Sequence, residues 1–147
     1  MIYTNITKIA LKICFEAHKE QLDKSGLPYV FHPFHLAEQM TSEEACVCAL
    51  LHDVMEDTPI TAEDLVQMGI PREYTEVLSL LCHKEGVLYM DYVRALSKNK
   101  TAREVKIADL RHNSDLTRLS TVDEKALERV KKYKEALDFL LNIGDEQ

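Results

Sequence analysis

Apolar residues recur at the three- and four-residue spacing of helices along most of this 147-residue chain, and no alternating strand pattern persists anywhere. The first such segment spans residues 6–23, and a proline, a capping pair or a glycine marks where others begin or end. Further helices are predicted from residue 33, over 41–57, after 61, and over 71–81, 89–96, 102–119 and 121–143. The sequence therefore predicts an all-α fold, a helical bundle formed by one domain over residues 1–147.

The net charge of −7, from 18 basic and 25 acidic residues, argues against nucleic acid as the main ligand, because such proteins present a basic stripe. A small phosphorylated ligand is still compatible, since one pocket of an acidic protein can be positive. No apolar run approaches the roughly 18 residues of a membrane span, so we expect no membrane partner. With no secretory signal, and four cysteines that form no CxxC pair, we expect buried free thiols and a cytoplasmic location. The sequence leaves the oligomeric state open.

The stretch LLHDVMEDT places His52, Asp53, Glu56 and Asp57 within an otherwise apolar run. In a continuous helix, His52 and Glu56 lie on one side and Asp53 and Asp57 on a second side, about 100° away. Carboxylates this close repel one another, strongly when buried, and a divalent cation is the usual compensation. A solvated acidic face is the plain alternative, but the preceding ALL indicates a buried helix. The stretch therefore predicts a metal site.

Two other stretches supply partners for this site. FHPFH contains His32 and His35, and IADLRHN contains Asp109, His112 and Asn113 within an apolar helix. Two histidines and two aspartates form a mixed nitrogen and oxygen set, which suits an open-sided manganese or iron ion better than a closed structural zinc site. For His35 and His112 we favour structural or supporting roles over metal ligation.

Three blocks of the sequence resemble those of a known family, in the same order. They are HKEQLDKSGLPYVFHP, ALLHDVMEDT and VKIADLRHN. The chain resembles the HD-domain metal-dependent phosphohydrolases, and within them the alarmone hydrolase domain of the RelA/SpoT type, especially its small stand-alone versions. The resemblance extends from His18 to about Leu119. It implies an all-α HD-domain bundle.

The resemblance also implies an activity, hydrolysis of guanosine 3′,5′-bis(diphosphate), ppGpp, by a 3′-pyrophosphohydrolase that uses a divalent metal ion, usually Mn²⁺. The implied metal ligands are His32, His52, Asp53 and Asp109. Glu56 and Asp57 are implied to orient and deprotonate the attacking water. The implied nucleotide-binding residues are Lys24, Ser25 and Asn113. Among the cations Lys24, Lys106 and Arg111, we favour Lys24 at the substrate, and the other two are equally compatible with solvated helix charges.

The sequence departs from the family pattern at positions that concern the substrate. Asp23 stands where the family commonly has an arginine that packs against guanine, so a cation is replaced by an anion. Cys82-His83 replaces a Thr-Lys pair, and Leu110-Arg111 reverses the usual order of a basic and an apolar residue. Two alternatives therefore stay open, an HD-type hydrolase of another nucleotide and a non-catalytic nucleotide-sensing HD module. The intact pair Glu56 and Asp57 argues against the second.

Overall fold

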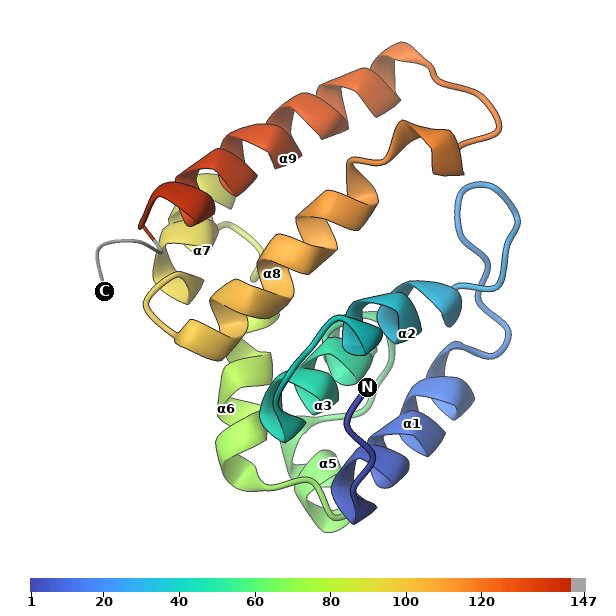
Figure 1. The fold of residues 1–147 in the computed structure, drawn as a ribbon, viewed down its shortest axis with the longest axis vertical. Helices are drawn as coiled ribbons and strands as arrows, with labels where there is room; N and C mark the ends of the chain where they lie inside the picture. Colours follow the sequence, from blue (N-terminus) through green and yellow to red (C-terminus); the bar gives the residue numbers. More distant parts are fainter. Residues whose placement is uncertain (144–147) are drawn as a thin grey trace.

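The computed structural model describes residues 1–143, and the last four residues lie outside the described part (Figure 1). Its elements are α1 (Asn5–His18), α2 (Phe31–Glu38), α3 (Glu43–Leu51), α4 (Val54–Asp57), α5 (Ala62–Gln67), α6 (Arg72–Leu81), α7 (Tyr89–Leu96), α8 (Lys100–Asn113), the 3₁₀ helix η1 (Leu116–Arg118) and α9 (Glu124–Ile143). Over this range the only extended pairing is an isolated bridge between Leu22 and Pro28. The predicted all-α fold is confirmed.

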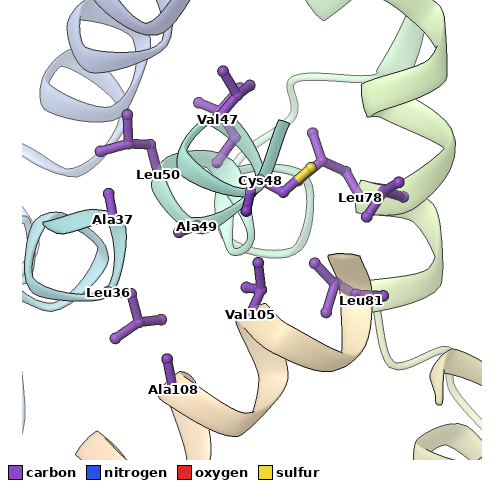
Figure 2. Packing of buried hydrophobic residues seen from close by; sticks show 14 of the residues in the cluster. Leu36, Ala37, Val47, Cys48, Ala49, Leu50, Leu78, Leu81, Val105 and Ala108 are labelled. Atoms are coloured by element: carbon purple, nitrogen blue, oxygen red, sulfur yellow. The ribbon is translucent and has the colours of Figure 1, made fainter. Parts of the chain in front are cut away.

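Helix α3 is the centre of the hydrophobic core. Every residue from Ala45 to Leu51 is buried, so this helix is apolar on all sides, as a helix must be when it is surrounded by others. It packs against α1, α2, α6 and α8. Figure 2 shows Cys48 of α3 pointing towards Leu78 of α6, and Leu50 on the side that faces Ala37 of α2. The C-terminal end of α3 is therefore fixed by packing, and the stretch HDVMED starts there.

The predicted helix over residues 6–23 ends earlier, at His18. The following residues fold back on themselves, because the Asp23 carboxylate oxygen Oδ1 accepts hydrogen bonds from the backbone amides of Ser25 and Leu27, at 2.8 and 3.0 Å. Gly26 adopts the left-handed conformation (φ 81°) that this tight turn needs. Asp23 therefore shapes the turn that carries the KSG residues.

Three other helix ends differ from the prediction, two of them because a different side chain caps them. Ser42, not Thr41, caps α3 by accepting from the Ala45 amide, and Asp123, not Thr121, accepts from the Ala126 amide at the start of α9. Helix α8 ends at Asn113, and η1 replaces its predicted last turn. The capping pair of Thr61 and Asp64 is confirmed, as are the bounds 89–96 of α7.

The prediction of one continuous helix through HDVMED is wrong. Helix α3 ends at Leu51, and the short helix α4 begins at Val54. The Nδ1 atom of His52 donates a hydrogen bond to the Ala49 carbonyl, at 2.7 Å, and the Asp53 backbone has φ −104° and ψ −2°, away from the values of a regular α-helix. The chain therefore bends at the two residues that carry the predicted metal ligands.

Within residues 1–143 no helix is long and apolar enough to cross a membrane. All four cysteines are free thiols. Cys14, Cys46 and Cys48 are buried as predicted, whereas Cys82 is only half-buried.

Replacing Leu50 by alanine should lower the free energy of unfolding by about 2–5 kcal/mol, because it empties a fully buried site at the centre of the core. Leu127 on α9 is 52% exposed, and the same change there should cost less than about 0.5 kcal/mol. Urea denaturation of both variants, followed by circular dichroism, measures the difference. Equal losses in the two variants would contradict the central position of α3.

Candidate functional site

Three side chains from different helices meet at the end of α3, and all three were predicted metal ligands. His32 of α2, His52 after α3 and Asp109 of α8 are buried, and one potential ligand atom from each lies within 4.8 Å of the others. The His32 Nε2 atom is 2.9 Å from Asp109 Oδ1, and His52 Nε2 is 3.5 Å from the same oxygen. The core packing of α2, α3 and α8 thus brings together residues up to 77 positions apart.

Asp53, the fourth predicted ligand, joins this cluster because of the bend in the chain. Its Oδ2 atom lies 3.0 Å from His52 Nε2, and the Tyr29 hydroxyl donates a hydrogen bond to the same oxygen. Burial opposes ionisation of Asp53, but His52 outweighs it and holds the pKa of this carboxyl below its ordinary value. Asp53 is therefore a carboxylate at neutral pH, with one oxygen facing the cluster.

The His52 ring shows that the cluster fits a cation. Its Nδ1 atom bonds the Ala49 carbonyl and so carries the ring proton, whereas its buried Nε2 atom makes no hydrogen bond and faces oxygens of Asp53 and Asp109. Burial disfavours a second proton, but these carboxylates outweigh burial and raise the pKa of His52 well above its ordinary value. Positive charge is therefore favoured at this point, and a metal ion would supply it without protonating the ring.

The Asp109 carboxylate is held by further donors on its own helix. Lys106 Nζ lies 2.9 Å from Oδ2, and the Asn113 side-chain amide donates to Oδ1 at 3.0 Å. Burial opposes the charge, but Lys106 and the histidine contacts outweigh it and hold the pKa of Asp109 well below its usual range. The Lys106 side chain is only 13% exposed, so its reading as a solvated helix charge is wrong.

His112 lies directly behind His32. The two Nδ1 atoms are 2.7 Å apart and the rings are stacked, while the His35 ring lies 4.2 Å from that of His112, centroid to centroid. Burial, and then the charge of Arg118, lowers the pKa of His112 to about 4, so its ring is neutral at pH 7. A neutral His112 accepts a hydrogen bond from the protonated Nδ1 of His32, which leaves His32 Nε2 free as a ligand atom. This contact agrees with the supporting role predicted for His112.

The two predicted water-activating residues point in different directions from α4. Glu56 faces the cluster side, where its Oε1 atom accepts a hydrogen bond from the His83 backbone amide at 2.5 Å. Burial raises the pKa of Glu56 above its ordinary value, against that hydrogen bond. Asp57 instead lies by α1, where the Gln21 amide donates to it at 3.2 Å. The structure therefore places Glu56, but not Asp57, in the cavity beside the cluster.

Two neighbouring cavities open beside the cluster and share part of their lining. The metal-side cavity, of about 220 Å³, is lined by His52, Asp53, Glu56, Asp109, Lys106 and Lys132, among others. The loop-side cavity, of about 290 Å³, is lined by Lys24, Ser25, His32, Arg118 and Arg129, among others. Asn113 and Tyr133 line both cavities, so the predicted substrate residues Lys24, Ser25 and Asn113 lie along one cleft. The Ser25 hydroxyl donates to the Arg118 carbonyl, at 2.6 Å.

Several residues of the site were not singled out in the sequence. Tyr29 lies in the turn before α2, three positions before the predicted ligand His32, and this nearness in sequence was its only signal. His83 drew notice only as a departure from the family pattern. Arg129 and Tyr133 of α9 carried no signal, because their positions are typical of an ordinary amphipathic helix. The predicted candidate Arg111 lies elsewhere, exposed on α8 beside Gln39 and Glu104.

Sequence comparisons relate the chain to alarmone enzymes. It is 31% identical to the bifunctional (p)ppGpp synthase/hydrolase SpoT of Escherichia coli over 125 residues, which cover 71% of this chain and 17% of SpoT. It is 30% identical to a guanosine-3′,5′-bis(diphosphate) 3′-pyrophosphohydrolase of Borreliella burgdorferi, over 84% of this chain and 20% of that protein. A probable GTP pyrophosphokinase of Mycobacterium leprae is 28% identical over 95% of this chain and 19% of its own length. The chain thus spans about a fifth of the length of these curated relatives. No family model matches it.

A solved structure has the same fold. A metazoan orthologue of SpoT that hydrolyses ppGpp superposes with a TM-score of 0.75 and 20% identity, over 96% of this chain and 88% of its own. The sequence relatives and the solved structure both indicate the family that HKEQLDKSGLPYVFHP, ALLHDVMEDT and VKIADLRHN resemble. The chain is therefore a homologue of the RelA/SpoT-type (p)ppGpp hydrolases and has the all-α fold of the HD-domain bundle.

Proposed function

We propose that this chain is a metal-dependent phosphohydrolase that removes the 3′-diphosphate of ppGpp. The observation that carries the proposal is the cluster of His32, His52, Asp53 and Asp109, which opens into a cavity that also contains the carboxylate of Glu56. Relatives named as 3′-pyrophosphohydrolases of this nucleotide support the choice of substrate.

The proposed ligands of the ion are His32 Nε2, His52 Nε2 and oxygens of Asp53 and Asp109. A mixed nitrogen and oxygen set that faces a cavity suits Mn²⁺, which we propose as the ion. When bound, it would supply Lewis-acid chemistry, because it would polarise a phosphoryl oxygen and make a water molecule more acidic. Tyr29, Lys106 and His112 would hold the ligand side chains in their observed orientations.

Glu56 is the proposed base of the reaction. Its carboxylate accepts a proton from the attacking water, whose oxygen bonds to the phosphorus joined to the 3′-oxygen of the ribose. That P–O bond breaks, the 3′-oxygen takes a proton, and the products are GDP and pyrophosphate. The His83 amide orients Glu56. The raised pKa of Glu56 makes its carboxylate a better proton acceptor than that of an ordinary glutamate. Asp57, the other residue implied by the resemblance, lies outside this cavity beside Gln21, so the proposed proton transfer uses Glu56 alone.

The charges along the cleft suit a polyphosphate. Burial lowers the pKa of Lys24, and the nearby cations Arg129 and Lys132 lower it further. Like charges held together cost free energy in the empty protein, and phosphate groups would relieve that cost. We therefore propose that Lys24 contacts the nucleotide together with Ser25 and Asn113. The expected cytoplasmic location stays a prediction.

A second candidate function is hydrolysis of another nucleotide, and Asp23 at the position of a family arginine is the observation that favours it. The non-catalytic sensing module is less well supported, because a pure binder does not need Glu56 beside the cluster.

Purified protein with added Mn²⁺ should convert ppGpp to GDP and pyrophosphate, resolved by anion-exchange chromatography. A panel of other nucleoside polyphosphates, monophosphates and cyclic nucleotides runs in parallel. Cleavage of a panel member without ppGpp turnover would favour the second candidate function. Binding without any turnover would favour the sensing module.

Asp109→Asn should weaken Mn²⁺ binding by about 100-fold, because it removes the charge that faces both histidines. Asp91→Asn, a change in an exposed ion pair on α7, is the matched control and should bind metal normally. Metal content after dialysis and isothermal titration both report the difference. An Asp109→Asn variant that retains the metal content and Mn²⁺ affinity of the wild type would refute the proposed ligand set.

Glu56→Gln should lower kcat by about 10²–10⁴-fold while the protein still binds metal, because the amide accepts no proton. Wild-type kcat should fall as the pH drops through the raised pKa of Glu56, since protonation removes the base. The control Glu85→Gln changes an exposed loop glutamate and should leave kcat unchanged. Rates measured at saturating Mn²⁺ from acidic to neutral pH test both points. A fully active Glu56→Gln would refute this role.

A further inference from the structure

We propose that Arg118, held in place by Asp23, is the cation that contacts the purine base of the nucleotide. This inference rests on the proposed function, since it assigns the base end of the same cleft. It concerns a residue in η1, outside the three sequence blocks, and explains how an aspartate is tolerated at position 23.

Two contacts fix the guanidinium of Arg118. Its Nη1 atom donates to the His112 carbonyl at 2.8 Å, and its Nη2 atom lies 4.0 Å from Asp23 Oδ2. A third contact fixes its backbone, because the Ser25 hydroxyl donates to the Arg118 carbonyl at 2.6 Å. These bonds tie the loop after α1 to the turn before α9, two segments that lie at the same end of the bundle (Figure 1). The planar group is therefore restrained by one hydrogen bond and one longer ion-pair contact before any ligand binds.

The carboxylate of Asp23 does not stand free in the cavity. Its Oδ1 atom is occupied by the amides of Ser25 and Leu27, and its Oδ2 atom faces Arg118. The negative charge at this position is thus balanced by a cation from a segment 95 positions along the chain. A nucleotide that entered the loop-side cavity would meet a neutral pair and not a bare anion.

The cavity wall around Arg118 combines apolar side chains with a partly exposed guanidinium, as a pocket for a nucleotide base does. Leu22, Leu119, Ala126 and Val130 supply apolar surface to the same cavity, and the Arg118 side chain is 25% exposed. Asn113 and Tyr133 line both this cavity and the neighbouring metal-side cavity. A nucleotide with its phosphates at the cluster would therefore place its base among these side chains.

A fixed guanidinium is well suited to such a place. It is planar and weakly hydrated, and it stacks on heteroaromatic rings, whereas the ammonium of a lysine is a compact, strongly hydrated charge. A purine offers a larger ring face than a pyrimidine, so the arrangement predicts a preference for purine nucleotides. Lysine at position 118 would retain attraction to Asp23 but would lose the planar surface.

The test compares Arg118→Ala, Arg118→Lys and the matched control Arg111→Ala, an exposed arginine of α8 away from both cavities. Arg118→Ala should raise KM for ppGpp by about tenfold, with kcat within about twofold of wild type, as expected when a stacking contact to the bound base is lost. Arg118→Lys should not restore KM. Arg111→Ala should match the wild type in both constants.

Other results would overturn the inference. An unchanged KM in Arg118→Ala, or a KM fully restored in Arg118→Lys, would show that Arg118 only ties the loop to η1 through its charge. A fall in thermal stability with lower kcat and normal KM would show the same.

Titration calorimetry with GDP and CDP in Mn²⁺ separates this inference from the proposed function. If the wild type does not cleave ppGpp, but binds GDP better than CDP and loses GDP in Arg118→Ala, the proposed function fails and the base contact stands. If ppGpp is cleaved while Arg118→Ala binds GDP as the wild type does, the function stands and the base contact fails. A wild type that binds no GDP would also exclude the base contact.

Discussion

The buried carboxylate of Asp109 is the interaction on which the site depends. A charge removed from water is tolerated only with close partners, and here they come from three helices: His32 from α2, His52 from the end of α3, and Lys106 and Asn113 from α8 itself. The two histidines could not reach Asp109 unless α2, α3 and α8 packed closely around the core. The apolar composition of α3 therefore serves the chemistry indirectly, because it fixes where the polar groups meet.

The break between α3 and α4 is the second constraint. In an unbroken helix, Asp53 and Asp57 would share one side and His52 and Glu56 another. The bend instead turns Asp53 towards Tyr29 and the cluster, sends Glu56 to the His83 amide and leaves Asp57 beside Gln21. The two carboxylates of α4 thus have different surroundings, and burial raises the pKa of Glu56. Different surroundings suit different roles, which is why Glu56 carries the proton transfer in the proposed mechanism.

Much of the fold was predictable because local signals agree with the packing. Pro71, Gly86 and the Thr61 cap mark helix boundaries through their own backbone chemistry, so α5, α6 and α7 were located well. The end of α1 and the bend at His52 were not predictable, since each depends on a side chain that takes a backbone group in competition with the helix.

Some residues of the site were predictable from the sequence and others were not. The metal candidates carry a signal because ionisable residues in apolar segments are unusual, and the structure brings His32, His52, Asp53 and Asp109 together. Arg118 has no such signal, because an arginine in a polar turn is ordinary in sequence. Arg118 is singled out only by its contact with Asp23, which lies 95 positions earlier in the chain. A departure from a family pattern at one position therefore has to be judged with the residues that face it in space.

The net charge of the chain does not describe the charges around the cleft, because folding gathers cations that are far apart in the sequence. The chain as a whole is acidic, yet Lys24, Arg118, Arg129 and Lys132 converge on one cleft from the loop after α1, η1 and α9. Burial and the neighbouring cations disfavour the charge on Lys24 in the protein alone, so this convergence has no benefit to stability. It does benefit a bound polyanion, because the cations at one end and a metal ion at the other would share the phosphate charge. The acidic surface elsewhere then concentrates attraction at the cleft instead of spreading it over the molecule.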